Sequence, residues 1–194
     1  MTQATTREEW LMHAVNQLKP IFEEKGYVIP AIRISCGFPS SGARSSHIGE
    51  CWSTESSESG INEIFIHPNQ DGPVAVLDII THELVHAIDN CKHRHDKEFR
   101  EIALKVGLAG PMRMSSATPQ LKEHLQNIAA TLGPYPHGRM KIVRKLRPYK
   151  PRSHARCSEC GYEIIPLKKW IHLGPPICPL DKIEMLPIGE WEDA

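Results

Sequence analysis

Apolar side chains recur along the chain at two spacings, and these spacings separate helical from extended segments. Repeats of three and four residues predict helices, and each predicted helix begins with residues that favour a helix start. The helices open at the capping box of Thr6 and Glu9, at Pro73, at Asp96, and at Thr118 followed by Pro119. Alternation of apolar and polar residues predicts three strands, at residues 31–36, 47–52 and 61–67.

Strands and helices in this order indicate an α+β fold, which we expect to be a small antiparallel sheet backed by helices. A chain of 194 residues can bury one substantial core and carry a small appendage. The composition changes sharply near residue 139. We therefore expect a main domain at residues 1–138, a basic linker or strand at 139–156, and a small module at 157–194.

The helix that begins at Pro73 contains an H-E-x-x-H pentapeptide formed by His82, Glu83 and His86. Side chains four residues apart lie on one face of a helix, so both histidines can bind one metal ion, for which Zn²⁺ is the usual partner. Glu83 lies beside such a metal and can take a proton from a water molecule bound to it. The alternative is a pair of histidines hydrogen-bonded inside a core helix, but buried polar groups need partners and a metal supplies them.

A catalytic zinc site needs a third protein ligand and an open position for water. The metzincin spacing is excluded, because Lys92 occupies the position of its third histidine and Asp89 that of its glycine. His93 and His95 remain as candidates. We favour His95, because it stands at the start of the helix that opens at Asp96 and a rigid element supports tight ligation.

A second metal site is predicted near the C-terminus. Cys157 and Cys160 have C-x-x-C spacing with Gly161 after them, and 17 residues separate Cys160 from Cys178. Asp181 stands where a four-cysteine ribbon would have its last cysteine, and its carboxylate can bind zinc. His172 is the competing fourth ligand, and a ribbon that has lost its metal is the alternative for the whole module.

Basic residues accumulate between the two predicted metal sites. The whole chain has 23 basic and 23 acidic residues, so the eight basic ones at 139–156 leave 15 basic against 23 acidic elsewhere. Clustered positive charge favours a nucleic-acid phosphate backbone, and a solvated linker is the alternative. The candidate DNA contacts are Arg139, Lys141, Arg144, Lys145, Arg147, Lys150, Arg152 and Arg156.

Several segments together resemble the SprT-like (Spartan-type) zinc metalloproteases, especially their phage and bacterial members. The resemblance covers residues 30–186 and is carried by H-E-L-V-H at 82–86, H-x-x-x-F at 95–99, I-G-E-C-W at 48–52, E-I-F-I at 63–66, and the C-terminal C-x-x-C. It implies a zincin-like fold with His82, His86 and His95 as zinc ligands and Glu83 as the catalytic acid and base. It also implies that a DNA-binding zinc module follows the protease domain.

The function that these features predict is a zinc endopeptidase that hydrolyses proteins bound or crosslinked to DNA. Two zinc ions are expected, one catalytic and one structural, and the DNA partner is expected to be single-stranded or a junction. Two alternatives remain: a non-catalytic nucleic-acid-binding protein with structural zinc, and a peptidase that cuts one dedicated partner with the ribbon as adaptor. Glu83 argues against the first alternative, because a structural zinc site needs no base.

Residues around the predicted catalytic site have further candidate roles. Asp78 and Asp89 are expected to orient the ligand imidazoles, since each lies close to them in sequence. The hydrogen-bond donor that stabilises the oxyanion is expected among His93, Tyr135 and His137. Cys36 and Cys51 fall in segments that can approach the site, and either thiol there would silence the zinc.

Composition and the N-terminal sequence define the expected compartment. No stretch approaches the ~20 apolar residues that cross a membrane, and residues 1–9 lack the features of a secretory signal. We therefore expect a cytoplasmic or nucleoid-associated protein, without a membrane partner, whose six cysteines are reduced. We favour a monomer.

Overall fold

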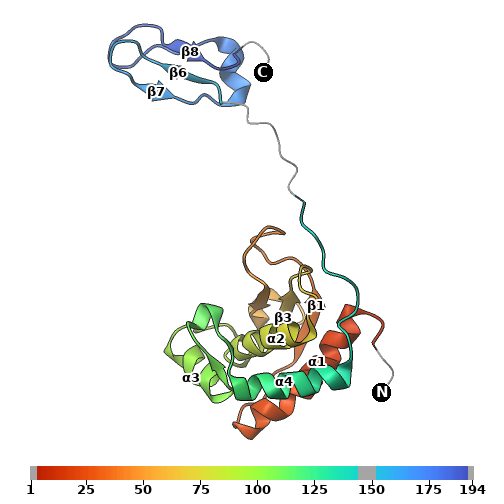
Figure 1. Cartoon of the computed structure of the whole chain (residues 1–194). Helices are drawn as coiled ribbons and strands as arrows, with labels where there is room; N and C mark the ends of the chain where they lie inside the picture. The colour runs from red at the N-terminus through yellow and green to blue at the C-terminus, as the bar shows by residue number, and fades with distance from the viewer. Residues whose placement is uncertain (1–3, 144–151, 192–194) are drawn as a thin grey trace. The chain divides into compact units, whose positions relative to one another are not determined.

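The computed structural model describes residues 4–143 and 152–191. The chain divides into two units, residues 1–143 and 144–194, and each is described by itself (Figure 1). The sequence predicts domain boundaries at 138/139 and 156/157, and the division between the two units falls between these, at 143/144. Helices and small sheets are mixed along the chain, so the α+β class that the sequence predicts is confirmed.

The first unit begins with helix α1, Arg7–Glu24, which starts at the predicted capping box. The hydroxyl of Thr6 accepts from the backbone N–H of Glu9 at 3.2 Å, and the Glu9 carboxylate accepts from the backbone N–H of Thr6 at 3.2 Å. These two bonds satisfy donors that the first turn of a helix leaves free. The apolar face of α1 is buried through Trp10, Leu11, Ala14, Val15, Leu18 and Phe22.

Three short strands form the sheet of this unit: β1, Ile32–Cys36; β2, Gly49–Trp52; and β3, Asn62–Ile66. Their order is β1-β3-β2, with β1 parallel and β2 antiparallel to β3. The predicted antiparallel sheet is therefore wrong for one of its two strand pairs. The chain reverses between β1 and β2 and again between β2 and β3, so β3, which lies between the other two, runs parallel to β1.

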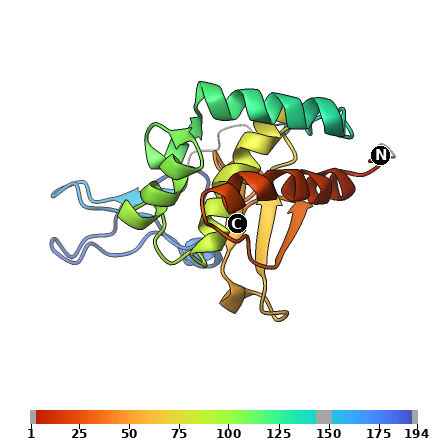
Figure 2. The same ribbon diagram turned by 90° about the horizontal axis from the view of Figure 1, so that it is seen from below.

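Helix α2, Pro73–Ile88, is the centre of the first unit (Figure 2). It packs on β2 and β3, while α1 packs on β1, and helix α4, Pro119–Leu132, lies against both helices. Pro73 occupies the first turn of α2, and Thr118 caps α4 through the backbone N–H of Leu121 at 3.4 Å, as the sequence predicts. Nine of the residues of α2 are buried: Val76, Leu77, Ile79, Ile80, Thr81, Glu83, Leu84, Val85 and Ala87.

Between α2 and α4 the chain forms two elements that position side chains on α2. Helix α3, Lys97–Lys105, is capped by the side chain of Asp96 and buries Phe99 and Ala103. Strands β4, Leu108–Ala109, and β5, Ser116–Ala117, form an antiparallel pair that the sequence did not predict. Two-residue strands are too short for an alternating pattern to show.

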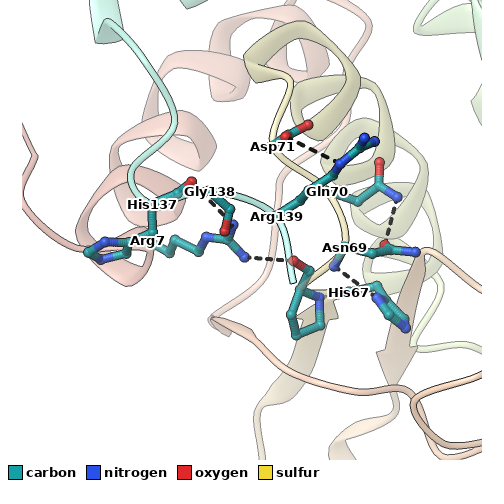
Figure 3. A network of polar contacts seen from close by, with 9 residues as sticks. Arg7, His67, Asn69, Gln70, Asp71, His137, Gly138 and Arg139 are labelled. Atoms are coloured by element: carbon teal, nitrogen blue, oxygen red, sulfur yellow. Dashed lines mark hydrogen bonds and ion pairs between the residues drawn. The ribbon is translucent and has the colours of Figure 1, made fainter. Parts of the chain in front are cut away.

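A buried arginine holds the end of the first unit to its beginning (Figure 3). Arg7 is 6% exposed, and its guanidinium donates to the carbonyl oxygens of Pro68 at 3.2 Å, Pro136 at 3.0 Å and Gly138 at 3.1 Å. It also lies over the ring of Tyr135, 4.8 Å from the centroid. These contacts define the Arg7 cluster, which fixes the course of the chain as it leaves α4.

The second unit contains a three-stranded antiparallel sheet of order β7-β6-β8. Its strands are β6, His154–Arg156; β7, Glu163–Ile164; and β8, Leu186–Ile188. Its buried core has four residues, Ala155, Cys157, Cys178 and Met185. So small a core does not stabilise a domain by itself, so another source of stability is needed.

Within the described ranges, 4–143 and 152–191, no helix has the length and apolar character needed to cross a membrane.

We expect Arg7→Met to lower the free energy of unfolding of the first unit by about 2–4 kcal/mol, because several partly buried backbone carbonyls lose the charged donor of a buried side chain. Urea denaturation followed by circular dichroism measures this change. Arg33→Met is the matched control, since Arg33 is 56% exposed and pairs with Glu63 at the surface; it should cost less than about 1 kcal/mol. An equal decrease in the free energy of unfolding of the two variants would show that the Arg7 cluster stabilises the unit no more than a surface ion pair does.

Candidate metal centres

Three histidines converge at the C-terminal half of α2, and we call them the histidine cluster: His82, His86 and His95. The Nε2 atom of His95 lies 3.1 Å from that of His82 and 3.2 Å from that of His86. His82 and His86 come from successive turns of α2, and His95 comes from the loop just before α3. The ring of Phe99, which is fully buried, forms the floor, with centroid distances of 4.4–5.0 Å to the three imidazoles.

This geometry fits a metal ion with three imidazole ligands. Tetrahedral zinc with Zn–N bonds of about 2.0–2.1 Å places its ligand nitrogens about 3.3 Å apart, close to the two observed separations. Burial, followed by the neighbouring imidazoles, lowers the pKa of His82 to about 4 and that of His86 to about 3. Burial also lowers the pKa of His95. The rings are therefore neutral near pH 7, which is the form that binds a metal.

Ser115, which directly precedes β5, orients one of these ligands. Its Oγ lies 2.9 Å from Nδ1 of His82. In the tautomer whose Nδ1–H donates to this Oγ, Nε2 carries the lone pair that faces the histidine cluster. Sequence reasoning missed Ser115, because nothing in the sequence predicts that the β4–β5 segment folds back over α2.

The two aspartates expected to orient the imidazoles do not do so, and this expectation is wrong. Asp78 accepts from the backbone N–H of Ala117 at 2.9 Å, so it ties β5 to α2. Asp89 caps the end of α2 and lies 3.3 Å from Nδ1 of His93. His93 is therefore turned toward Asp89, and His95 is the histidine that joins His82 and His86.

Glu83 lies on α2 next to the histidine cluster but is not part of it. It is 6% exposed, and burial, helped by the nearby Cys91 and Glu50, raises the pKa of its carboxyl to about 8. Strand β2 passes directly over this carboxylate. A Cβ atom at Gly49 would lie 2.5 Å from Oε1 of Glu83 and 2.6 Å from Cγ2 of Ile79, so only glycine fits at this position.

The other candidates near this site lie elsewhere. Tyr135 packs on Trp10 and Arg7, and the carbonyl of His137 accepts from Arg7 at 3.4 Å, so both belong to the Arg7 cluster. The thiol of Cys36 also contacts Arg7, at 3.2 Å. None of these three residues is among the side chains that the described structure brings to the histidine cluster.

Cys51 likewise has a partner outside the histidine cluster. Its Sγ lies 3.4 Å from Sγ of Cys91. Arg113 and His47 do lie close to the histidine cluster. Their charges contribute to the lowered pKa of His95.

The second unit brings together the four residues that the sequence singles out, and we call them the cysteine cluster: Cys157, Cys160, Cys178 and Asp181. Oδ2 of Asp181 lies 3.1 Å from Sγ of Cys157 and 3.4 Å from Sγ of Cys178, and Sγ of Cys160 lies 3.6 Å from that of Cys178. His172 lies in the 3-10 helix Lys168–Leu173 and is outside the cluster as described.

Two turns of the same geometry build the cysteine cluster. In the first, the N–H of Cys157 donates to the carbonyl of Tyr162 at 2.9 Å, and the N–H of Gly161 donates to that of Cys157 at 3.1 Å. In the second, the backbone N–H of Cys178 donates to the carbonyl of Ile183 at 2.8 Å, and the backbone N–H of Lys182 donates to the carbonyl of Cys178 at 3.0 Å. Asp181 thus occupies the position of Cys160 in a repeated turn.

The sequence indicates the first of these turns, through Gly161, but not the second. Gly161 has φ +74°, which glycine adopts readily, whereas the equivalent Lys182 has φ +61°, which is uncommon for a residue with a Cβ. A hydrogen bond with the Asp181 carboxylate raises the pKa of Cys160 to about 12. At Cys160 this environment opposes a free thiolate nucleophile, whereas a divalent cation among the four groups would stabilise the charged forms of all of them.

The predicted DNA contacts are described only in part. Arg139 and Lys141 are exposed in the first unit, and Arg152 and Arg156 are exposed in the second. Arg139 lies 3.9 Å from Asp71, and Arg156 lies 3.6 Å from Glu163 (Figure 3 shows the first pair). Arg144, Lys145, Arg147 and Lys150 lie outside the described residues.

We expect Ser115→Ala to weaken metal binding at the histidine cluster about tenfold, because His82 loses the partner that fixes its tautomer. Cobalt titration in competition with a chelator measures this affinity, and the absence of a thiolate charge-transfer band distinguishes the histidine cluster from the cysteine cluster. Ser116→Ala, one residue further along, is the matched control and should change nothing. Identical cobalt affinity in the two variants would contradict the role of Ser115.

We expect Asp181→Ala to weaken metal binding at the cysteine cluster at least about tenfold, since one of four ligands is removed. Asp181→Cys should retain the site and intensify the thiolate–cobalt absorption. His172→Ala should leave the cobalt spectrum and affinity unchanged. If His172→Ala lowered the affinity and Asp181→Ala did not, the fourth ligand would be the histidine.

No protein-family model, no curated protein and no solved structure matches this chain.

Proposed function

We propose that this chain is a zinc-dependent endopeptidase that acts on proteins bound or crosslinked to DNA, with a zincin-like first unit and a zinc ribbon as its second. The observation that carries the proposal is the arrangement on α2 and beside it. Nε2 of His95 lies within 3.2 Å of Nε2 of both His82 and His86, and the carboxyl group of Glu83 lies next to these three neutral imidazoles without joining them. A purely structural site would have no need for that carboxylate.

A few residues of the first unit would carry out the hydrolysis of a peptide bond. His82, His86 and His95 would hold a zinc ion, which would supply Lewis acidity and lower the pKa of a water molecule that it binds to about 7. The charge of that ion would favour the ionised form of Glu83, which would then take the proton from the attacking water and give it to the amine that leaves the scissile peptide. Phe99 and the burial of α2 keep bulk water away from the imidazoles. We assign the stabilisation of the oxyanion to Arg113, whose positive charge acts on His95.

Strand β2 is suited to hold the substrate. It is an edge strand in the sheet that the structure describes. The carbonyl of Cys51 already accepts from the thiol of Cys91, so we assign the pairing with an extended peptide to the backbone at Gly49. At Gly49 the same strand touches Glu83, so a peptide added at this edge would lie along the catalytic carboxylate. Main-chain pairing depends little on side-chain identity, which favours a protease of broad sequence preference.

The basic segment at residues 139–156 supports an association with DNA. It carries eight positive charges without an acidic residue, while the rest of the chain has an excess of acidic residues. Attachment to DNA through this segment and the ribbon would raise the effective concentration of the enzyme near DNA-bound proteins. The resemblance to SprT-like proteases supports the same function, and a cytoplasmic or nucleoid-associated monomer fits it.

Glu83→Gln should keep the metal of both sites and lower peptide hydrolysis by at least about a hundredfold, because the proton acceptor is lost. The assay uses a DNA-binding protein crosslinked to a single-stranded oligonucleotide, with metal content measured on the same sample. Glu101→Gln, an exposed change on α3, is the control and should retain activity.

A second variant tests the DNA association, with all eight basic residues of 139–156 changed to Gln. It should lose the DNA stimulation and much of the salt dependence of binding, while it still cleaves an unattached peptide. Equal cleavage with and without DNA in the unmodified chain would contradict the DNA association and favour a peptidase with a dedicated partner. Full metal content without cleavage of any substrate would favour the binding protein.

A further inference from the structure

Two cysteines from distant parts of the sequence meet beside the histidine cluster. Cys51 belongs to strand β2, and Cys91 follows the end of α2 by three residues. Their Sγ atoms are 3.4 Å apart, and Sγ of Cys91 is also 3.4 Å from the carbonyl oxygen of Cys51. Both residues are partly exposed, so a small reagent can reach them.

Hydrogen bonds of Cys91 and of the residue before it hold Cys91 in this position. The preceding residue, Asn90, accepts from the backbone N–H of Thr54 at 2.8 Å and from the side chain of Asn62 at 3.0 Å. The N–H of Cys91 itself donates to the carbonyl of His86 at 2.8 Å. Asn90 and Cys91 both have positive φ, +55° and +60°, a conformation that surrounding contacts must support. The approach of the two thiols is therefore built into the fold.

The two cysteines also connect the two halves of the site. Gly49, which touches the Glu83 carboxylate, precedes Cys51 by two residues in the same strand. His95 follows Cys91 by four residues in the loop that ends at α3. A bond between the sulfurs would join the strand over Glu83 to the loop that carries the third histidine.

We propose that Cys51 and Cys91 form a reversible disulfide, made by exchange with an oxidised low-molecular-weight thiol such as glutathione disulfide. One cysteine thiolate attacks the small disulfide and forms a mixed disulfide, and one small thiolate leaves. The second cysteine, as its thiolate, attacks the sulfur of the first, and the second small thiolate leaves. The two cysteines lose two electrons and two protons, and the small disulfide takes up both.

Bond formation needs only a small movement. A disulfide has an S–S distance of about 2.0 Å, so the sulfurs must approach by about 1.4 Å from their present 3.4 Å. The bond closes a loop that contains β3 and all of α2, and it limits local opening of the segment from Cys91 to His95. The oxidised chain should therefore release metal from the histidine cluster more slowly. This consequence rests on the proposed metal site, whereas the disulfide does not.

The test equilibrates the full-length, zinc-loaded protein with reduced and oxidised glutathione in a series of ratios. Free thiols are trapped and peptides are mapped by mass spectrometry. The expected result is a crosslinked peptide pair of Cys51 and Cys91, lighter by two hydrogens and restored by dithiothreitol. Cys36, which lies in the Arg7 cluster, is the internal control and should stay a thiol or carry glutathione.

Variants and exchange measurements complete the experiment. Cys51→Ser and Cys91→Ser should each leave glutathione on the remaining cysteine, and Cys36→Ser should leave the crosslink intact. Amide hydrogen exchange at residues 89–96 should slow about tenfold in the oxidised wild type, and so should zinc release to a chelator. Two free thiols, or only mixed disulfides, in the oxidised wild type would overturn the proposal. A disulfide without any change in zinc release would leave the disulfide in place and count against the metal site at His95.

Discussion

Burial of polar side chains in an apolar helix is the constraint on which the first unit depends. Helix α2 is buried on most of its surface, yet it carries His82, Glu83 and His86 into the interior. Such groups are costly unless each finds a partner. The surrounding elements supply them: His95 approaches from the loop before α3, Ser115 holds His82, and the backbone of β2 comes close to Glu83 at Gly49. The cation that we propose between the three imidazole nitrogens would give each of them a partner.

In the second unit, too, polar or ionisable side chains lie in the core, which is much smaller here. Two of its four core residues are cysteines, and large apolar side chains such as Trp170 and Leu180 stay exposed. Apolar burial alone is therefore a weak source of stability here. The two repeated turns bring four ligand groups to one point, and a bound metal would supply most of the folding free energy of this unit. In both units, the residues that could hold a metal are thus also residues on which structural stability depends.

Sequence reasoning succeeded where the signal is local. The capping box of α1, the proline starts of α2 and α4, and the pairing of His82 with His86 all follow from spacings within one element. It failed where distant segments meet. The parallel pairing of β1 with β3 depends on strand order, and Ser115 depends on how the chain folds back over α2. The aspartates near the histidines in sequence point elsewhere, because proximity along a helix does not fix the direction of a side chain.

The most direct test of this account is the number of zinc ions in the intact chain, measured by native mass spectrometry on protein purified without chelators. The account requires two zinc ions in the wild type. It also requires the loss of one ion in His86→Ala, with the other retained by the cysteine cluster. A wild-type chain with no zinc at the histidines, or a His86→Ala variant that still holds two ions, would contradict it.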